Sequence, residues 1–331
     1  MLQSWFAAVC SAAVLASAVT AGDAYDAQAQ AIVDGFSADQ LLGQMTQLTL
    51  ATVMNGTTRT LNETAVRSFA KQHVGSYLNT YWDGPVNGSY GYNASEFRSI
   101  IQRIQEISME ENGGHPIIYG IDSVHGANYV DGSVLMPQQI NSGASFNPDL
   151  VYEVARITAR DTEAAGISWV FGPILDISQN TLWARTYETF GEDPYLASVM
   201  GAALVRGLQS YNQTAACIKH FIGYSKTPTG HDRDNVNMPD FDLLNYFLPP
   251  FKAAFEAGTV PTAAACVASS AEFISTSSLS ELASSISGNA SLGEGARNEK
   301  CRPHSSGGWN LLEGSTAALV PVANRVDVSR I

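Results

Sequence analysis

Between residues 27 and 258, short apolar runs alternate with longer amphipathic stretches. The runs lack the in-out alternation of a half-exposed strand, and continuous apolar runs are typical of parallel strands that are buried on both faces. They predict strands at residues 44–48, 74–78, 117–121, 169–175 and 216–221, with a sixth at 261–265. Strands that alternate with helices in this way predict a parallel α/β fold.

The stretches between the strands carry recognisable helix starts. A side chain that caps the first turn, or a proline within that turn, is favoured at such a start. Capping-box pairs occur at Ser37 with Gln40 and at Asn93 with Glu96, and cap-proline pairs occur at Asn147-Pro148 and Asp193-Pro194. Glycine is favoured just after a helix, so Gly258 is placed to end a helix over residues 247–257.

Two parallel architectures fit this periodicity. A (β/α)8 TIM-like barrel needs roughly 250 residues, and the chain has 331. A doubly wound open sheet fits the same spacing, although no GxGxxG motif follows the first predicted strand. The periodicity by itself therefore leaves both architectures open.

The first 21 residues indicate the compartment. They are apolar apart from a few polar positions and end in small residues, which is typical of a secretory signal peptide. They contain no Lys or Arg, and the alternative is a membrane anchor, but the apolar run is short for a membrane span. Asn-x-Ser/Thr sequons at Asn55, Asn62, Asn87, Asn93, Asn212 and Asn289 agree with secretion. We expect a secreted, extracellular glycoprotein without a membrane-spanning segment.

Charge and missing motifs exclude several classes of function. The formal net charge is -13, whereas a nucleic-acid partner requires a basic surface. Only 15% of the residues are charged, which suits a neutral substrate. No CxxC, HExxH or P-loop motif occurs, so we expect neither a metal nor a cofactor. Residues 264–331 are rich in Ser, Gly and Ala, and this composition predicts a divergent, poorly ordered tail.

Five side chains at or after the predicted strands are candidates for a binding site, because the active face of a barrel lies at the strand carboxyl ends. Asp122 can accept hydrogen bonds from two neighbouring hydroxyls or cap a helix. The fork of Arg185 suits hydroxyl pairs or a carboxylate. Lys219 and His220 are adjacent, so a regular strand would point them to opposite faces unless a bulge intervenes. Arg233 lies in a charge run that is typical of a solvated loop.

Two glutamates, Glu188 and Glu192, follow Arg185 closely. A pair of carboxylates often performs acid–base catalysis, and a barrel enzyme that uses these two is one alternative. Because donors are plentiful nearby, we interpret both as partners of Arg185 and of its loop. His125 is expected to hold the loop that follows Asp122.

Taken together, the motifs carry a resemblance to a known family. They are residues 120–126 (GIDSVHG), 183–195 (WARTYETFGEDPY), 219–224 (KHFIGY) and 230–233 (GHDR), in this order and at these distances. Residues 27–263 resemble the N-terminal barrel domain of glycoside hydrolase family 3. The KHFIGY sequence, in place of the KHFPGHG of the N-acetylhexosaminidase branch, favours the β-glucosidase and β-xylosidase branches, with β-glucosidase as the first choice.

The resemblance implies a site and a reaction. Asp122, Arg185, Lys219 and His220 are expected to hold the nonreducing sugar of a β-glucoside or oligosaccharide, with Arg233 near that pocket. The family cleaves β-linked sugars with retention, using an Asp nucleophile and a Glu acid/base. Family members carry a (β/α)8-like barrel followed by an α/β sandwich domain.

Two departures from the family pattern shape our expectations. The usual Arg-Trp-Gly-Arg is replaced by Leu182-Trp183-Ala184-Arg185, and no Asp-Trp pair carrying the nucleophile follows residue 263. We therefore assign no catalytic residue and expect a truncated, incomplete barrel of about six strands out of eight. Such a chain is expected to be weakly active or inactive, and the alternative to a β-glucosidase is a non-catalytic secreted sugar-binding protein or a β-xylosidase.

Overall fold

The computed structural model describes residues 26–81 and 91–258. Within them, five short strands form one sheet in which every neighbouring pair is parallel. The sheet order is β1 (Gln47–Thr49), β2 (Ser76–Leu78), β4 (Ile118–Ile121), β6 (Trp169–Val170) and β7 (Ala215–Ala216). Outside this sheet, β3 (Tyr92–Asn93) pairs in parallel with β5 (Val130–Asp131). The predicted parallel α/β class is confirmed.

The helices begin where the capping signals place them. Ser37 and Asn93 each form a complete capping box, and prolines follow the caps Asn147 and Asp193. The α-helices are α2 (Asp26–Asp34), α3 (Ala38–Gln44), α4 (Glu63–Ala70), α5 (Ala94–Glu111), α6 (Gln139–Ala144), α7 (Pro148–Ala164), α8 (Pro194–Leu208), α9 (Asp240–Asp242) and α10 (Leu248–Glu256). Shorter turns are the 3-10 helices η2 (Leu50–Val53) and η3 (Thr186–Glu188) and the π-helix η4 (Leu243–Phe247).

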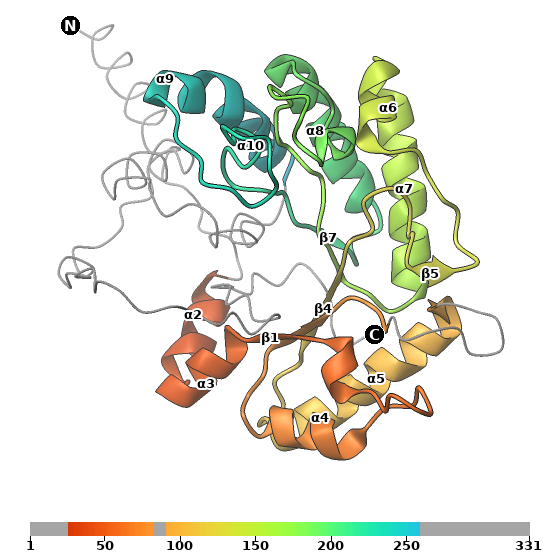
Figure 1. The fold of residues 1–331 in the computed structure, drawn as a ribbon. Coiled ribbons are helices and arrows are strands. Elements are labelled where there is room, and N and C mark those ends of the chain that lie inside the picture. Colours follow the sequence, from red (N-terminus) through yellow and green to blue (C-terminus); the bar gives the residue numbers. More distant parts are fainter. Residues whose placement is uncertain (1–25, 82–90, 259–331) are drawn as a thin grey trace, which may run out of the picture.

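The strand order bears on the two architectures that the periodicity left open. A doubly wound sheet reverses its strand order, whereas here each strand of the sheet lies beside the one before it in the chain. Because crossover connections are right-handed, an order that never reverses puts all the helices on one face. Figure 1 shows α4, α5, α7, α8 and α10 around the strands in chain order, and neighbours in this series pack on each other. The main sheet of the described residues therefore lacks the reversal of strand order that a doubly wound sheet requires.

The strands are shorter than predicted, and their boundaries shift for local reasons. Helix α3 runs through Gln44, so β1 begins at Gln47 rather than at residue 44. Regular pairing in β6 stops at Val170, and the N–H of Gly172 donates back to the carbonyl of Val170 over 2.9 Å rather than to a neighbouring strand. The pairing resumes beyond the regular strands as a parallel bridge between Ile174 and Lys219. The predicted strands 169–175 and 216–221 are therefore each a two-residue strand with an irregular extension.

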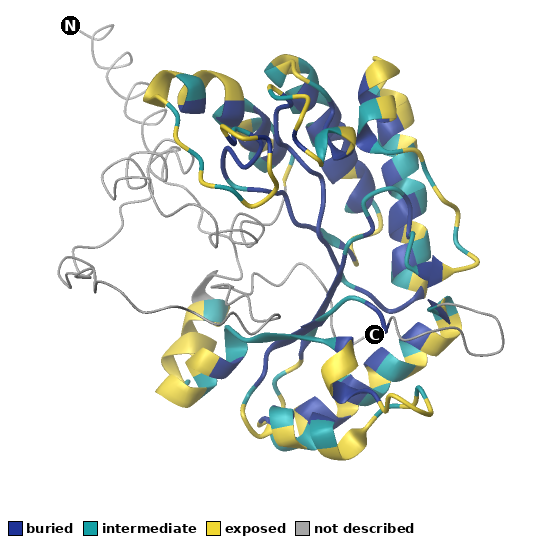
Figure 2. Ribbon diagram, viewed as in Figure 1, coloured by how far each residue is buried: buried dark blue, intermediate teal, exposed yellow. Residues whose placement is uncertain are grey.

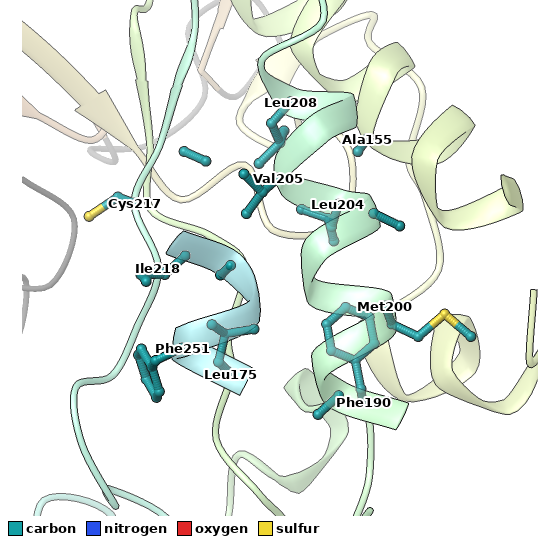
Figure 3. Close-up of a cluster of buried hydrophobic side chains, with 14 of the residues drawn as sticks. Ala155, Leu175, Phe190, Met200, Leu204, Val205, Leu208, Cys217, Ile218 and Phe251 are labelled. Atoms are coloured by element: carbon teal, nitrogen blue, oxygen red, sulfur yellow. The ribbon is translucent and has the colours of Figure 1, made fainter. Parts of the chain in front are cut away.

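One hydrophobic cluster fixes the segment that precedes Lys219. In Figure 3, Leu204 and Leu208 of α8 lie between Ala155 of α7 and the segment that carries Ile218, with Phe251 of α10 close by. All five of these side chains are buried, and Figure 2 shows burial concentrated along the strands and the inward sides of the helices. This packing anchors the end of β7, where two candidate site residues follow.

A second cluster fixes the strand that precedes Asp122. Tyr77 of β2 and Tyr119 and Ile121 of β4 pack against Phe97 and Ile104 of α5. The hydroxyl of Tyr119 donates a hydrogen bond to the carbonyl of Asn79, so even this buried polar atom ties β4 to the end of β2. Strand β4 thus ends at a defined place on the sheet edge.

Three of the predictions concern residues that the structure does not describe. The signal peptide over residues 1–21, the sixth strand at 261–265 and the tail over 264–331 lie outside the described residues. Within the described residues, no helix combines the length and the apolar character that crossing a membrane requires. In that same part of the chain, no group of three or more His, Cys, Asp or Glu side chains is arranged to hold a metal ion.

Candidate functional site

The candidate side chains meet at one edge of the sheet. Asp122 follows β4 directly, and Lys219 and His220 follow β7. The carboxyl ends of parallel strands lie on the same edge, so residues far apart in the sequence come together there. Beyond the regular strands, the N–H of Leu175 donates to the carbonyl of Lys219 over 2.6 Å, and the N–H of Lys219 donates to the carbonyl of Pro173 over 3.0 Å. These bonds hold the two irregular segments side by side.

The first contact in the site is an ion pair between Lys219 and Asp122. The Nζ of Lys219 bonds to Oδ1 of Asp122, and the ammonium also lies 5.9 Å from the ring centre of Phe171. The Lys219 side chain is only 8% exposed, whereas that of Asp122 is 33% exposed. A buried ammonium needs a counter-ion, so Asp122 stabilises Lys219 while it keeps a face toward solvent.

Arg185 forms the second charged group of the site. Its Nε and Nη2 donate to the two carboxylate oxygens of Glu188 over 2.9 and 2.7 Å, a bidentate pair within the turn η3. Its Nη1 lies 3.1 Å from Nε2 of His220. Burial acts to lower the pKa of Arg185, but the hydrogen bonds with Glu188 outweigh it and raise that pKa. The guanidinium is therefore charged and held in a fixed orientation.

His220 lies between Arg185 and a buried carboxylate. Its Nδ1 is 2.7 Å from Oδ2 of Asp176, which also accepts the backbone N–H of His220 over 3.2 Å. A guanidinium has no acceptor, so Nε2 of His220 must accept from Arg185, and the ring proton must lie on Nδ1 and point to Asp176. Burial lowers the pKa of His220, against an opposing effect of Asp176, which favours this neutral tautomer.

Tyr224 forms one wall beside these groups. Its ring centre lies 4.6 Å from that of His220 and 5.6 Å from that of Trp183, and the guanidinium carbon of Arg185 lies 5.7 Å from it. Its hydroxyl donates to Oδ1 of Asp232 over 2.5 Å. Tyr224 therefore packs the histidine and the arginine against one aromatic surface.

Four of the five candidates converge and one does not. Lys219 pairs with Asp122, and its neighbour His220 bonds to Arg185. The Arg233 side chain is 83% exposed, and the ion-pair partner found for it among the described residues is Asp232, at 3.9 Å. The adjacent Lys219 and His220 both enter the site because they lie beyond the regular strand, where in-out alternation does not apply; the peptide bond between them is cis.

The glutamates behave differently from each other. The interpretation of Glu188 as a partner of Arg185 is confirmed by its two hydrogen bonds. Glu192 is exposed, and none of the contacts found for Arg185 among the described residues involves it, so its predicted contact with Arg185 is not found there. Sequence reasoning also missed Asp176 and Tyr224. The signal that the sequence offered for Asp176 was a carboxylate directly after an apolar run.

The loop after Asp122 depends on a glycine. Gly126 has φ +86°, and a Cβ there would lie 2.3 Å from the carbonyl oxygen of Val134, which is backbone and cannot move aside easily. We expect Gly126→Ala to lower the free energy of unfolding by about 3 kcal/mol, from backbone strain and the steric clash together. Urea denaturation measures this change.

Gly132 supplies a matched control. Its φ is +80°, but a Cβ would meet nothing within 4 Å. Gly132→Ala is therefore expected to cost only about 1 kcal/mol, from the backbone conformation alone. Equal decreases in the free energy of unfolding of the two variants would show that the close approach of Gly126 to Val134 does not add to the cost of the substitution.

Comparison with known proteins gives this geometry a context. The model of the glycosyl hydrolase family 3 N-terminal domain matches residues 37–272, which is more than half of the chain. The chain belongs to glycosyl hydrolase family 3. The family expected from the four motifs is thereby confirmed, and all the converging side chains lie inside the matched region.

The relatives within family 3 include both glucosidases and xylosidases. The lysosomal beta glucosidase of Dictyostelium discoideum is 43% identical over 245 residues, which are 69% of this chain and 30% of that protein. A beta-xylosidase of Formosa agariphila is 32% identical over 172 residues, 48% of this chain and 24% of its own length. A crystal structure of the beta-glucosidase from Listeria innocua in complex with glucose matches with a TM-score of 0.57 at 28% identity, covering 70% of this chain and 32% of the other. The chain thus spans a third or less of each of these proteins.

Acidification is expected to destabilise this family 3 chain through His220. Its pKa is lowered from the usual value of about 6.5. As the pH falls below about 6.5, the pKa of an unperturbed histidine, the ring of His220 binds a proton in the unfolded chain but not in the folded chain. The free energy of unfolding then decreases by up to about 1.4 kcal/mol per pH unit, until the pH reaches the lowered pKa.

Denaturation at pH values between about 7.5 and 5 tests this, with His220→Gln as the reference that lacks the ring. The wild type should lose stability more steeply than the variant over this range. Parallel pH profiles in the two chains would contradict the expectation.

Proposed function

We propose that the described site binds the terminal nonreducing β-D-glucosyl residue of a β-glucoside, and that the chain belongs to the retaining β-glucosidases of its family. The convergence of Lys219, Asp122, Arg185 and His220 on one sheet edge carries this proposal. The relatives support it, since they include beta-glucosidases and one of these was crystallised with glucose.

The chemistry of the site suits a neutral polyhydroxylated ligand. The ammonium of Lys219 is matched by Asp122, and the guanidinium of Arg185 is matched by Glu188. Because each cation already has a counter-ion, the site offers directional donors and acceptors without a large unbalanced charge. Charge-assisted hydrogen bonds to sugar hydroxyls, about 1.5–3 kcal/mol each, supply affinity and orientation.

Turnover by this chain is a separate part of the proposal. Retention requires two carboxylates roughly 5–5.5 Å apart across the scissile bond. Asp122 and Glu188 are each already paired with a cation, and Asp176 is buried against His220. No Asp-Trp motif follows residue 263 in the sequence. We therefore propose that sugar binding is retained while hydrolysis by these 331 residues is weak or absent.

Architecture and location complete the proposal. We take the five strands of the main sheet as consecutive members of a (β/α)8-type wall. We further propose that the chain is secreted and glycosylated. In support, the four sequon asparagines in the described part, Asn55, Asn62, Asn93 and Asn212, are all exposed.

A β-xylosidase is the second candidate, since relatives of this chain include beta-xylosidases. Hydrolysis of nitrophenyl β-D-glucoside and nitrophenyl β-D-xyloside by the purified chain separates the two, with a circular dichroism melt recorded on the same sample. A cooperative melt with weak or no turnover is the expected result, and any residual turnover should favour the glucoside. Efficient hydrolysis would overturn the proposal of weak activity, and a preference for xyloside would overturn the choice of sugar.

A further inference from the structure

The structure contains a buried carboxylate, Asp176, that no motif of the sequence singled out. It follows the irregular extension of β6, and its side chain is 0% exposed. Its Oδ2 accepts two hydrogen bonds from His220, one from the ring and one from the backbone N–H. Its Oδ1 has no hydrogen-bond partner among the described residues. A buried carboxylate that bonds to a single neighbour needs a reason, since burying this charge is costly.

The geometry assigns Asp176 as a positioning residue that acts through His220. By accepting the Nδ1 proton, Asp176 keeps Nε2 of His220 unprotonated, and that nitrogen accepts from Nη1 of Arg185. The guanidinium is then held at both ends, by Glu188 on one side and by His220 on the other. This inference rests on the proposed sugar site, because its functional consequence is the orientation of two sugar-binding side chains.

The opposite tautomer would undo this arrangement. A proton on Nε2 would face a guanidinium N–H at 3.1 Å, so two donors would oppose each other and Arg185 would turn away. A doubly protonated ring would add a third cation beside Arg185 and Lys219. The groups that face His220 are Asp176 from the β6 side, Arg185 from the η3 side, and its neighbours Lys219 and Tyr224.

Two variants of the full chain test the assignment. Asp176→Ala removes the acceptor, whereas Asp176→Asn keeps a carbonyl oxygen that can accept both bonds from His220 and removes only the charge. We expect Asp176→Ala to lose about tenfold or more in glucose affinity, and Asp176→Asn to stay within about threefold of the wild type at neutral pH. Calorimetric titration with glucose measures both changes.

Nitrogen NMR of histidine-labelled protein reads the tautomer directly, with His220→Gln used to assign the signal. The wild type and Asp176→Asn should show His220 protonated at Nδ1. The pKa of His220 should be lower in Asp176→Asn than in the wild type, because Asp176 is the anion that favours the charged ring. A residue with only a structural role would change stability without moving this pKa.

The outcomes separate this inference from the proposed function. A wild-type ring protonated at Nε2, or a pKa of His220 that Asp176→Asn leaves unchanged, would overturn the positioning role. If Asp176→Ala does not fold, the tautomer and the pKa in Asp176→Asn still decide the question. If the wild type shows the expected tautomer and pKa shift but no heat with glucose, the positioning of His220 stands and the sugar site fails.

Discussion

Replacing Asp122 by alanine is expected to weaken glucose binding by about 100-fold or more. The change removes a carboxylate that is one-third exposed, and with it the charge-assisted hydrogen bonds that we propose it makes to sugar hydroxyls. It also leaves the ammonium of Lys219, which is only 8% exposed, without its counter-ion. A 100-fold loss corresponds to about 2.7 kcal/mol of binding free energy. Calorimetric titration with glucose measures it.

The exposed Asp39, in the first turn of α3, provides the control for a change of one negative charge. Asp39→Ala should leave glucose affinity unchanged within the precision of the titration. If Asp122→Ala folds cooperatively and binds glucose as tightly as the wild type, Asp122 does not contact the sugar and the position of the site is wrong.

Replacing Glu188 by glutamine is expected to lower the free energy of unfolding by about 3 kcal/mol and to weaken sugar binding as well. The Arg185 and Glu188 side chains are 24% and 11% exposed, and removing one member of a largely buried pair leaves the other charge uncompensated. Arg185 would then lose the carboxylate that fixes its orientation in the site. Urea denaturation gives the stability change, and glucose titration gives the change in affinity.

A second pair with the same sequence separation makes a matched control. Glu153 and Arg156 are also three residues apart on the chain, but their side chains are 49% and 39% exposed. Exposed pairs contribute little, so Glu153→Gln should cost at most about 0.5 kcal/mol. Similar decreases in the free energy of unfolding of the two variants would mean that burial of the Arg185–Glu188 pair does not increase its contribution to stability.

The sequence predicted which helices and strands occur more accurately than it predicted the residues at which the strands begin and end. The capping residues Ser37, Asn93, Asn147 and Asp193 all start helices, because a cap acts locally and needs no tertiary partner. The strands of two to four residues could not be bounded in this way, since each depends on neighbours distant in the chain. The parallel pair β3 and β5 was missed for the same reason, as two residues carry no periodic signal.

The residues of the site also differ in how well the sequence predicted them. Asp122, Arg185, Lys219 and His220 lie within motifs and could be named in advance, whereas Asp176 could not. Its role depends on a hydrogen bond to a residue 44 positions away, which no local pattern records. Arg233 shows the converse, because this residue lies inside a motif but is 83% exposed, and within the described part of the chain its ion-pair partner is its neighbour Asp232.

Calorimetric titration of the purified wild-type chain with glucose tests the central claim most directly, namely that these residues hold a sugar. The sample must first show a cooperative circular dichroism melt, so that binding is measured on folded protein. We expect saturable binding to one site per chain, with a dissociation constant in the micromolar to millimolar range (about −4 to −8 kcal/mol). A folded sample that gives no heat of binding at millimolar glucose would contradict the claim.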